Sequence, residues 1–153
     1  MSKFTELTDA QAEAVSRQEA KVAAARRFCY EFLQVFANFL EIPQQSSPQR
    51  LMFANPAKID FETGNISAGG EPLLFQKGWM RTVLYLHIEP TDFFIQFDLA
   101  YDPLAKQIQA SIGKTQQVIH MNKGGYPAMC QYVYDIVKNY IDRGPSVERV
   151  MVL

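Results

Sequence analysis

Apolar residues recur at helical spacing through the first forty positions of the chain. One row follows a spacing of seven: Val15, Val22, Cys29 and Phe36. No glycine or proline interrupts the sequence before Pro43, and Thr8 with Gln11 has the form of a capping box, so the pattern predicts an N-terminal helix over residues 8–42. A continuous helix would be about 50 Å long, against about 38 Å across a compact domain of this size. The helix therefore either breaks near Ser16 or overhangs, and an overhanging half would need a partner helix.

Between residues 80 and 121 the apolar positions alternate in four runs, as in strands with one buried face. Tight turns at residues 89–92, 102–105 and 113–114 join the runs into a four-stranded antiparallel meander. These turns imply three facing pairs: Ile88 with Phe93, Leu99 with Ile108, and Ile112 with Thr115. All three turns place one apolar set on a single face, which the helices are expected to cover: Leu84, Leu86, Ile88, Phe93, Ile95, Phe97, Leu99, Ile108, Ala110, Ile112 and Ile119.

The remaining segments complete a single α+β domain over residues 1–153. Pro127 suits the first turn of a second helix over about 127–142, which ends before Gly144. Residues 147–153 are expected to form a short C-terminal strand at a sheet edge, in this chain or in a partner. The sequence leaves open where strands between residues 50 and 66 pair, and whether the loop at 67–78 is a lid, a partner contact or a flap over the core. By topology alone, the element order resembles cystatin-like and secretion-chaperone-like folds.

The opposite face of the predicted meander is polar but carries little charge. Its candidate ligand-binding residues are Tyr85, Phe94, Gln96, Asp98, Gln109 and Ser111. The two aromatic rings would be apolar platforms and the amide and carboxylate groups would orient a ligand. The other interpretation is a solvated face, which antiparallel sheets commonly have.

Catalytic chemistry finds little support in this register. His87 is placed beside Phe94, and His120 lies two strands away, so no dyad, triad or metal cluster forms. No catalytic residue, metal or cofactor is therefore predicted, and the sequence favours a protein that is not an enzyme. An isomerase-like pocket that uses Asp98 and Tyr85 is the exception that stays open.

Two short stretches suggest phosphate or anion binding. The stretch from Gly113 to Thr115 ends like a Walker A loop, but Ile108 occupies the position of the first glycine and a strand follows, so a hairpin tip is expected instead. Lys123, Gly124 and Gly125 precede the second helix and are anion-binding candidates, although two glycines also suit an ordinary connector between a strand and a helix.

Composition, charge and the N-terminal sequence exclude some classes of function. The chain has 153 residues and a formal net charge of −1, so it lacks the basic excess that is typical of nucleic-acid-binding proteins. Two cysteines in apolar helical contexts suit a reducing compartment. No signal-peptide pattern and no membrane-spanning run are present, so a cytoplasmic protein without a membrane partner is expected.

Together these features favour a non-catalytic cytoplasmic binding or adaptor protein of a chaperone-like kind. It is expected to act as a homodimer or with a partner protein, through the long helix or the terminal strand. The alternative is a small-ligand-binding or isomerase-like protein that uses the polar face of the sheet.

Overall fold

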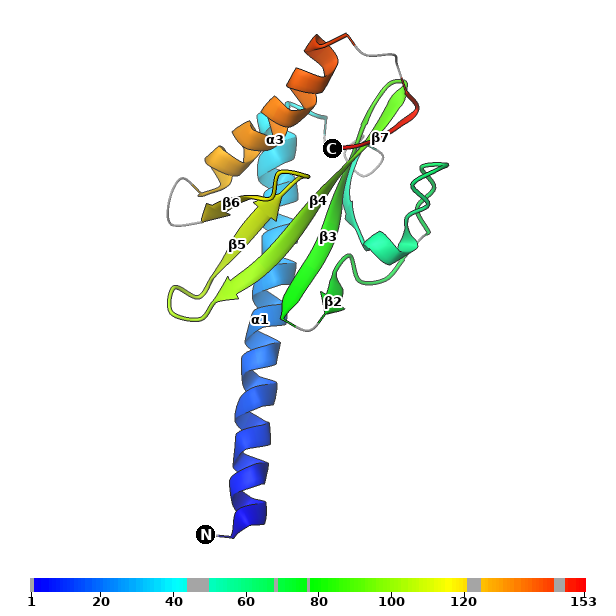
Figure 1. Cartoon of the computed structure of the whole chain (residues 1–153). Helices are drawn as coiled ribbons and strands as arrows, with labels where there is room; N and C mark the ends of the chain where they lie inside the picture. Colours follow the sequence, from blue (N-terminus) through cyan, green and yellow to red (C-terminus); the bar gives the residue numbers. More distant parts are fainter. Residues whose placement is uncertain (1, 44–49, 68, 77, 121–124, 145–147) are drawn as a thin grey trace.

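A computed structural model describes residues 2–43, 50–67, 69–76, 78–120, 125–144 and 148–153. Figure 1 shows a long N-terminal helix, a twisted and mostly antiparallel sheet, a second helix and a C-terminal strand. The α+β class is therefore confirmed. The elements are α1 (Lys3–Phe39), β1 (Leu51–Ala54), the 3-10 turn η1 (Pro56–Lys58), β2 (Leu74–Gln76), β3 (Trp79–Ile88), β4 (Thr91–Asp102), β5 (Gln107–Ile112), β6 (Gln117–His120), α3 (Gly125–Asp142) and β7 (Val150–Val152).

Helix α1 is continuous over 37 residues and has no break near Ser16. It begins five residues earlier than predicted, because Ser2 is the N-cap and its hydroxyl accepts from the Thr5 amide at 3.1 Å. The predicted capping box is wrong, since the Thr8 hydroxyl lies inside the helix and donates to the Phe4 carbonyl at 2.9 Å. The helix ends at Phe39 instead of 42, and Glu41 has a left-handed backbone conformation, with φ at 58°.

The sheet has seven strands, so the predicted four-stranded meander is incomplete. Strands β3 to β6 follow one another antiparallel, as expected, while β1 and β2 both pair with the outer edge of β3. Strand β7 pairs in parallel with the first residues of β4, within this chain. Strands β1 and β2 have only four and three residues, which is too short to show an alternating pattern in the sequence. Strand β7 lies within the C-terminal strand that was expected over residues 147–153.

Every predicted strand pairing is wrong by two residues. Three observed facing pairs show the shift: Ile88 with Thr91, Leu99 with Ala110, and Ile112 with Gln117. The first turn holds two residues instead of four, and the turn after Ile112 holds four instead of two. Side chains alternate between faces with a period of two, so a shift of two residues leaves each residue on its predicted face.

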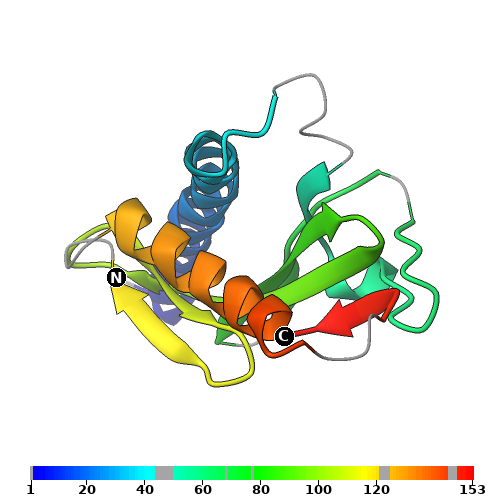
Figure 2. The ribbon, with the colours of Figure 1, turned by 90° about the horizontal axis from the view of Figure 1, so that it is seen from above.

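One large core lies between the helices and the predicted apolar face. It joins the second half of α1, through Phe28, Phe32 and Phe36, to the sheet and to α3. Of the predicted apolar set, all but Ile88 are buried. Figure 2, which looks along α1, shows α3 beside it and β7 beyond the C-terminal end of α3. Helix α3 begins at Gly125, two residues before the predicted start.

Candidate functional site

The polar face of the sheet brings together some of the predicted ligand-binding residues. The Asp98 carboxylate accepts from Arg81 Nε at 2.6 Å, from Gln96 Nε2 at 3.1 Å and from Gln116 Nε2 at 3.2 Å. Ser111 faces Asp98 on β5, and Gln109 is two residues away on the same strand. Asp98 is therefore held in a local network, while Gln109 and Ser111 make no side-chain hydrogen bond with any described residue.

The two aromatic candidates lie in a different part of this face. Phe94 is fully buried in a second, smaller core with Ala54, Ile59 and Val83, and the Phe61 ring packs edge-on against it. Tyr85 packs against Phe94 and is half-buried. The segment around η1 thus covers this end of the face, and Phe94 has no open ring surface to offer a ligand.

A cluster of hydrogen bonds at the β3–β4 hairpin was not predicted. Asp92 Oδ1 accepts from the Tyr85 hydroxyl at 2.9 Å and lies 2.7 Å from Nδ1 of His87. The other ring nitrogen of His87, Nε2, lies 3.0 Å from the Glu89 carboxylate. Four polar groups therefore form one chain, in the order Tyr85, Asp92, His87 and Glu89.

The register explains why the sequence did not reveal this cluster. The predicted four-residue turn placed Asp92 in the loop and His87 opposite Phe94. The observed two-residue turn starts β4 at Thr91, so that His87 faces Asp92 directly across the strands. The statement that no histidine–carboxylate pair forms is therefore wrong. One signal in the sequence could have indicated this pairing. The segment from His87 to Asp92 has Pro90 at its centre, and it suits a two-residue turn as well as the four-residue turn that was predicted.

The cluster changes the acidity of its members. Burial, with the hydrogen bond to Asp92 as the second cause, raises the pKa of Tyr85 to about 12, so its hydroxyl keeps its proton and donates it. The hydrogen bond to Asp92, and then the one to Glu89, raise the pKa of His87 above its ordinary 6.5 in spite of partial burial. His87 thus carries a positive charge over a wider pH range than a free histidine.

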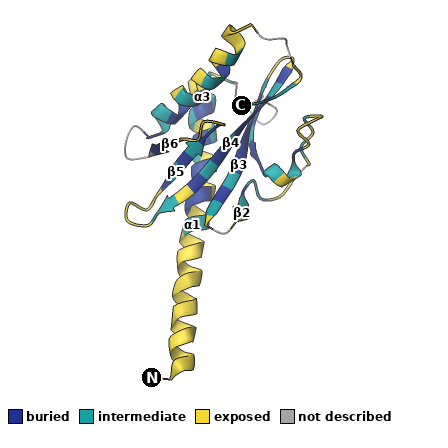
Figure 3. Cartoon of the chain, viewed as in Figure 1, coloured by how far each residue is buried: buried dark blue, intermediate teal, exposed yellow. Residues whose placement is uncertain are grey.

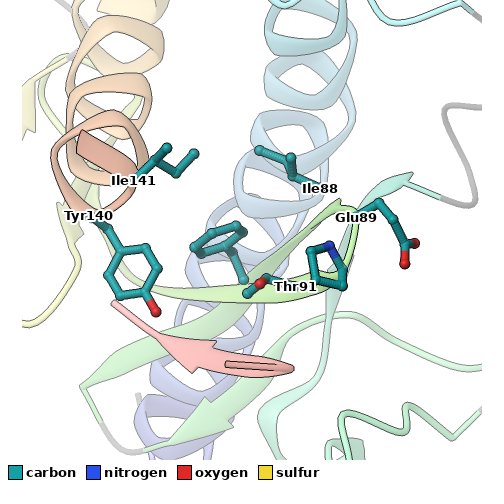
Figure 4. A pocket seen from close by; sticks show the side chains of 7 residues that line it. Ile88, Glu89, Thr91, Tyr140 and Ile141 are labelled. Atoms are coloured by element: carbon teal, nitrogen blue, oxygen red, sulfur yellow. The ribbon is translucent and has the colours of Figure 1, made fainter. Parts of the chain in front are cut away.

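Two cavities flank this hairpin, one on each face. The polar one has about 500 Å³ and is lined by His87, Glu89, Pro90, Asp92, Glu148 and Arg149. The apolar one has about 200 Å³ and is lined mainly by Ile88, Phe93, Tyr140 and Ile141. Figure 4 shows Ile88 on one side of it and Tyr140 and Ile141 on the other. The Tyr140 hydroxyl is buried beside it and has no hydrogen-bond partner among the described residues.

The first half of α1 forms a second candidate surface, outside the sheet. Residues 2–20 are all exposed, as Figure 3 shows, and the helix projects past the sheet. Phe4, Leu7 and Val15 are 79%, 70% and 45% exposed. Their row along the helix continues into Ala25, which is fully buried. These side chains form an exposed apolar stripe along the projecting half of α1.

The structure gives no support to the predicted anion site, and it leaves both cysteines buried. Lys123 and Gly124 lie outside the described residues, and Gly125 is the buried first residue of α3. The two cysteines are buried free thiols, and burial raises the pKa of Cys29 to about 12 and that of Cys130 to about 11. Neither thiol is therefore activated as a nucleophile.

Neither α1 nor α3, over its described residues, has an apolar stretch long enough to cross a bilayer. Among all the described residues of the chain, no three histidine, cysteine or acidic side chains are placed to share a metal ion. Comparison of the chain with known protein families, curated proteins and solved structures found no match.

Proposed function

We propose that the protein is a binding or adaptor protein that acts as a homodimer, with the exposed half of α1 as its dimer surface. The proposal rests on one observation, the exposed stripe of Phe4, Leu7 and Val15 that continues into the buried face of the same helix. Helices in proteins gain most of their stability by packing an apolar face, and this half packs on nothing within the described chain.

The occupant we propose for this surface is the same helix of a second copy. Two identical stripes related by a twofold axis are self-complementary, which is the commonest arrangement of soluble homo-oligomers. Helical periodicity puts Glu6, Glu13 and Arg17 on the opposite side from the stripe, and Glu13 and Arg17 are already paired at 3.8 Å. Pairing along the stripe would therefore leave these charges in water.

The test compares two substitutions that add the same charge to opposite sides of this half. Val15→Glu places a carboxylate on the stripe, where a partner helix would bury it, and Ala20→Glu places one on the far side. We expect Val15→Glu to weaken self-association at least about tenfold in sedimentation equilibrium, because burying an unpaired charge is costly. Ala20→Glu should associate like the wild type. Equal association of all three chains would contradict the proposal.

Ligand binding on the polar face of the sheet is less well supported. The Asp98 carboxylate already accepts several hydrogen bonds, and Phe94 is covered. Gln109 and Ser111 are the predicted residues that keep free polar groups, and two uncharged side chains give little binding energy. The homodimer is therefore better supported than ligand binding on this face.

A further inference from the structure

The chain of hydrogen bonds at the β3–β4 hairpin has the form of an oriented acid–base group. Asp92 is 18% exposed, and its carboxylate accepts from His87 Nδ1. A carboxylate at Nδ1 fixes the proton there, so that neutral His87 has its lone pair on Nε2. Nε2 lies on the side of Glu89, in the polar cavity of about 500 Å³.

Several parts of the fold hold the Asp92 carboxylate in place. The Tyr85 hydroxyl donates to it, and the Asp92 amide donates to the Arg149 carbonyl at 2.8 Å, which ties β4 to the start of β7. The backbone of Gly64 packs against the same carboxylate, because a Cβ added to Gly64 would lie 2.9 Å from Asp92 Oδ2. The φ of Gly64 is +79°, which also favours glycine at this position. A carboxylate enclosed on three sides keeps the imidazole in one orientation.

Glu89, Glu148 and Arg149 are the other charged residues that line the cavity, and of these the guanidinium suits chemistry at a carbonyl group. Glu89 is 84% exposed, so a ligand can displace its carboxylate from Nε2 without disturbing the fold. Arg149 lines the same cavity and forms no ion pair with any described residue. A guanidinium group that lines a cavity can stabilise negative charge that develops on a carbonyl oxygen bound there.

We propose that His87, Asp92 and Arg149 form a hydrolytic site for small esters in this cavity. His87 Nε2 removes a proton from water as the water oxygen forms a bond to the carbonyl carbon, and Arg149 stabilises the oxyanion. The bond from that carbon to the leaving oxygen then breaks, and His87 gives its proton to that oxygen to form an alcohol, or to solvent when a phenolate leaves. The new carboxylic acid loses the second proton of the attacking water to solvent and becomes a carboxylate. Asp92 is a positioning residue. The site lies at the opposite end of the molecule from the projecting half of α1 (Figure 1), so it is independent of the dimer proposal.

The test uses p-nitrophenyl acetate and the full chain, with release of p-nitrophenolate followed between about pH 5 and pH 9 to span the titration of histidine. His87→Gln should lower the protein-dependent rate at least about tenfold, within the range of general-base effects. The matched control is His120→Gln, which changes the other histidine and should leave the rate unchanged. Arg149→Gln should lower the rate, and because it removes a positive charge it should not move the midpoint of the pH profile to lower pH.

Two further variants separate a chemical role of His87 from a structural one. Glu89→Gln removes a carboxylate that raises the pKa of His87, so the midpoint should move to lower pH and the rate near neutrality should rise. Asp92→Asn should move the midpoint in the same direction and lower the maximal rate. Thermal unfolding of each variant checks its fold, and Glu89 is exposed enough for its variant to remain folded. Equal rates for the wild type and His87→Gln, or an unmoved midpoint in Glu89→Gln, would overturn the proposal.

Discussion

The two halves of α1 share one helix and one heptad spacing but have opposite surroundings. The second half buries three phenylalanines, Phe28, Phe32 and Phe36, which stack on one another. Phe32 also packs edge-on against Phe97 of the sheet. The first half has mostly alanine, glutamine and charged residues, and its larger apolar side chains are exposed. Identical spacing therefore does not imply identical burial. The size and number of the apolar side chains decide which half belongs to the core of a single chain, and the stripe with fewer large apolar side chains is the dimer surface that we propose.

The largest expected effect comes from the buried half. Phe32 is fully buried and packs against Phe28, Phe36 and Phe97. Phe32→Ala should lower the free energy of unfolding by about 3–5 kcal/mol, because it removes apolar contacts and leaves a cavity. Denaturant unfolding measures this. A loss below about 1 kcal/mol would mean that this half is not the centre of the core.

A smaller effect is expected from the sheet on which the buried half depends. Gly113 begins the β5–β6 turn with φ at +74°, and a Cβ there would lie 3.4 Å from Cδ1 of Ile136 in α3. Gly113→Val should cost about 1–3 kcal/mol of stability, because a branched residue is strained at positive φ. Thermal unfolding reports it. A fully stable variant would show that the turn, and with it the register of β6, is different.

His87, in the hydrogen-bonded cluster at the β3–β4 hairpin, should make the free energy of unfolding of the protein depend weakly on pH. The folded-state pKa of His87 is raised above 6.5, so its contribution is fully present below 6.5 and is lost as the pH rises through the folded value. The effect should be smaller than that of either substitution, since the imidazole is partly exposed. Denaturant midpoints measured at pH values below and above 6.5 test this pH dependence. His87→Gln is the control, since it should remove the change of the midpoint with pH. A slope that persists in this variant would assign the pH dependence to another group.

The smallest effect on the stability of one folded chain is expected in the exposed half. In dilute solution, where any dimer has dissociated, Val15→Glu should change the free energy of unfolding by less than about 0.5 kcal/mol, as surface substitutions usually do. The contrast with Phe32→Ala tests the comparison between the two halves. If Val15→Glu destabilised dilute protein by several kcal/mol, the first half would be packing within its own chain.

The sequence predicted the faces of the elements better than their pairing. Alternation placed residues such as Ile95 and Phe97 in the core, because burial depends on which side of a strand a residue occupies. A shift of two residues preserves every face, so hydrophobicity could not reveal that His87 faces Asp92 in place of Phe94. The length of one turn decided that pairing, and with it the candidate site. A strand as short as β2 carries too few residues for a pattern. Ser2 and Thr8 both suit an N-cap, so the start of α1 was ambiguous.

The most direct test of the dimer surface is hydrogen exchange along α1 at two protein concentrations. If a second copy covers the exposed half, amides of residues 8–20 should be protected at high concentration and should exchange faster on dilution, because the partner dissociates. Amides of residues 28–36 should keep their protection at both concentrations, since this part of the helix packs on the core of its own chain. Rapid exchange of residues 8–20 at every concentration would contradict the account.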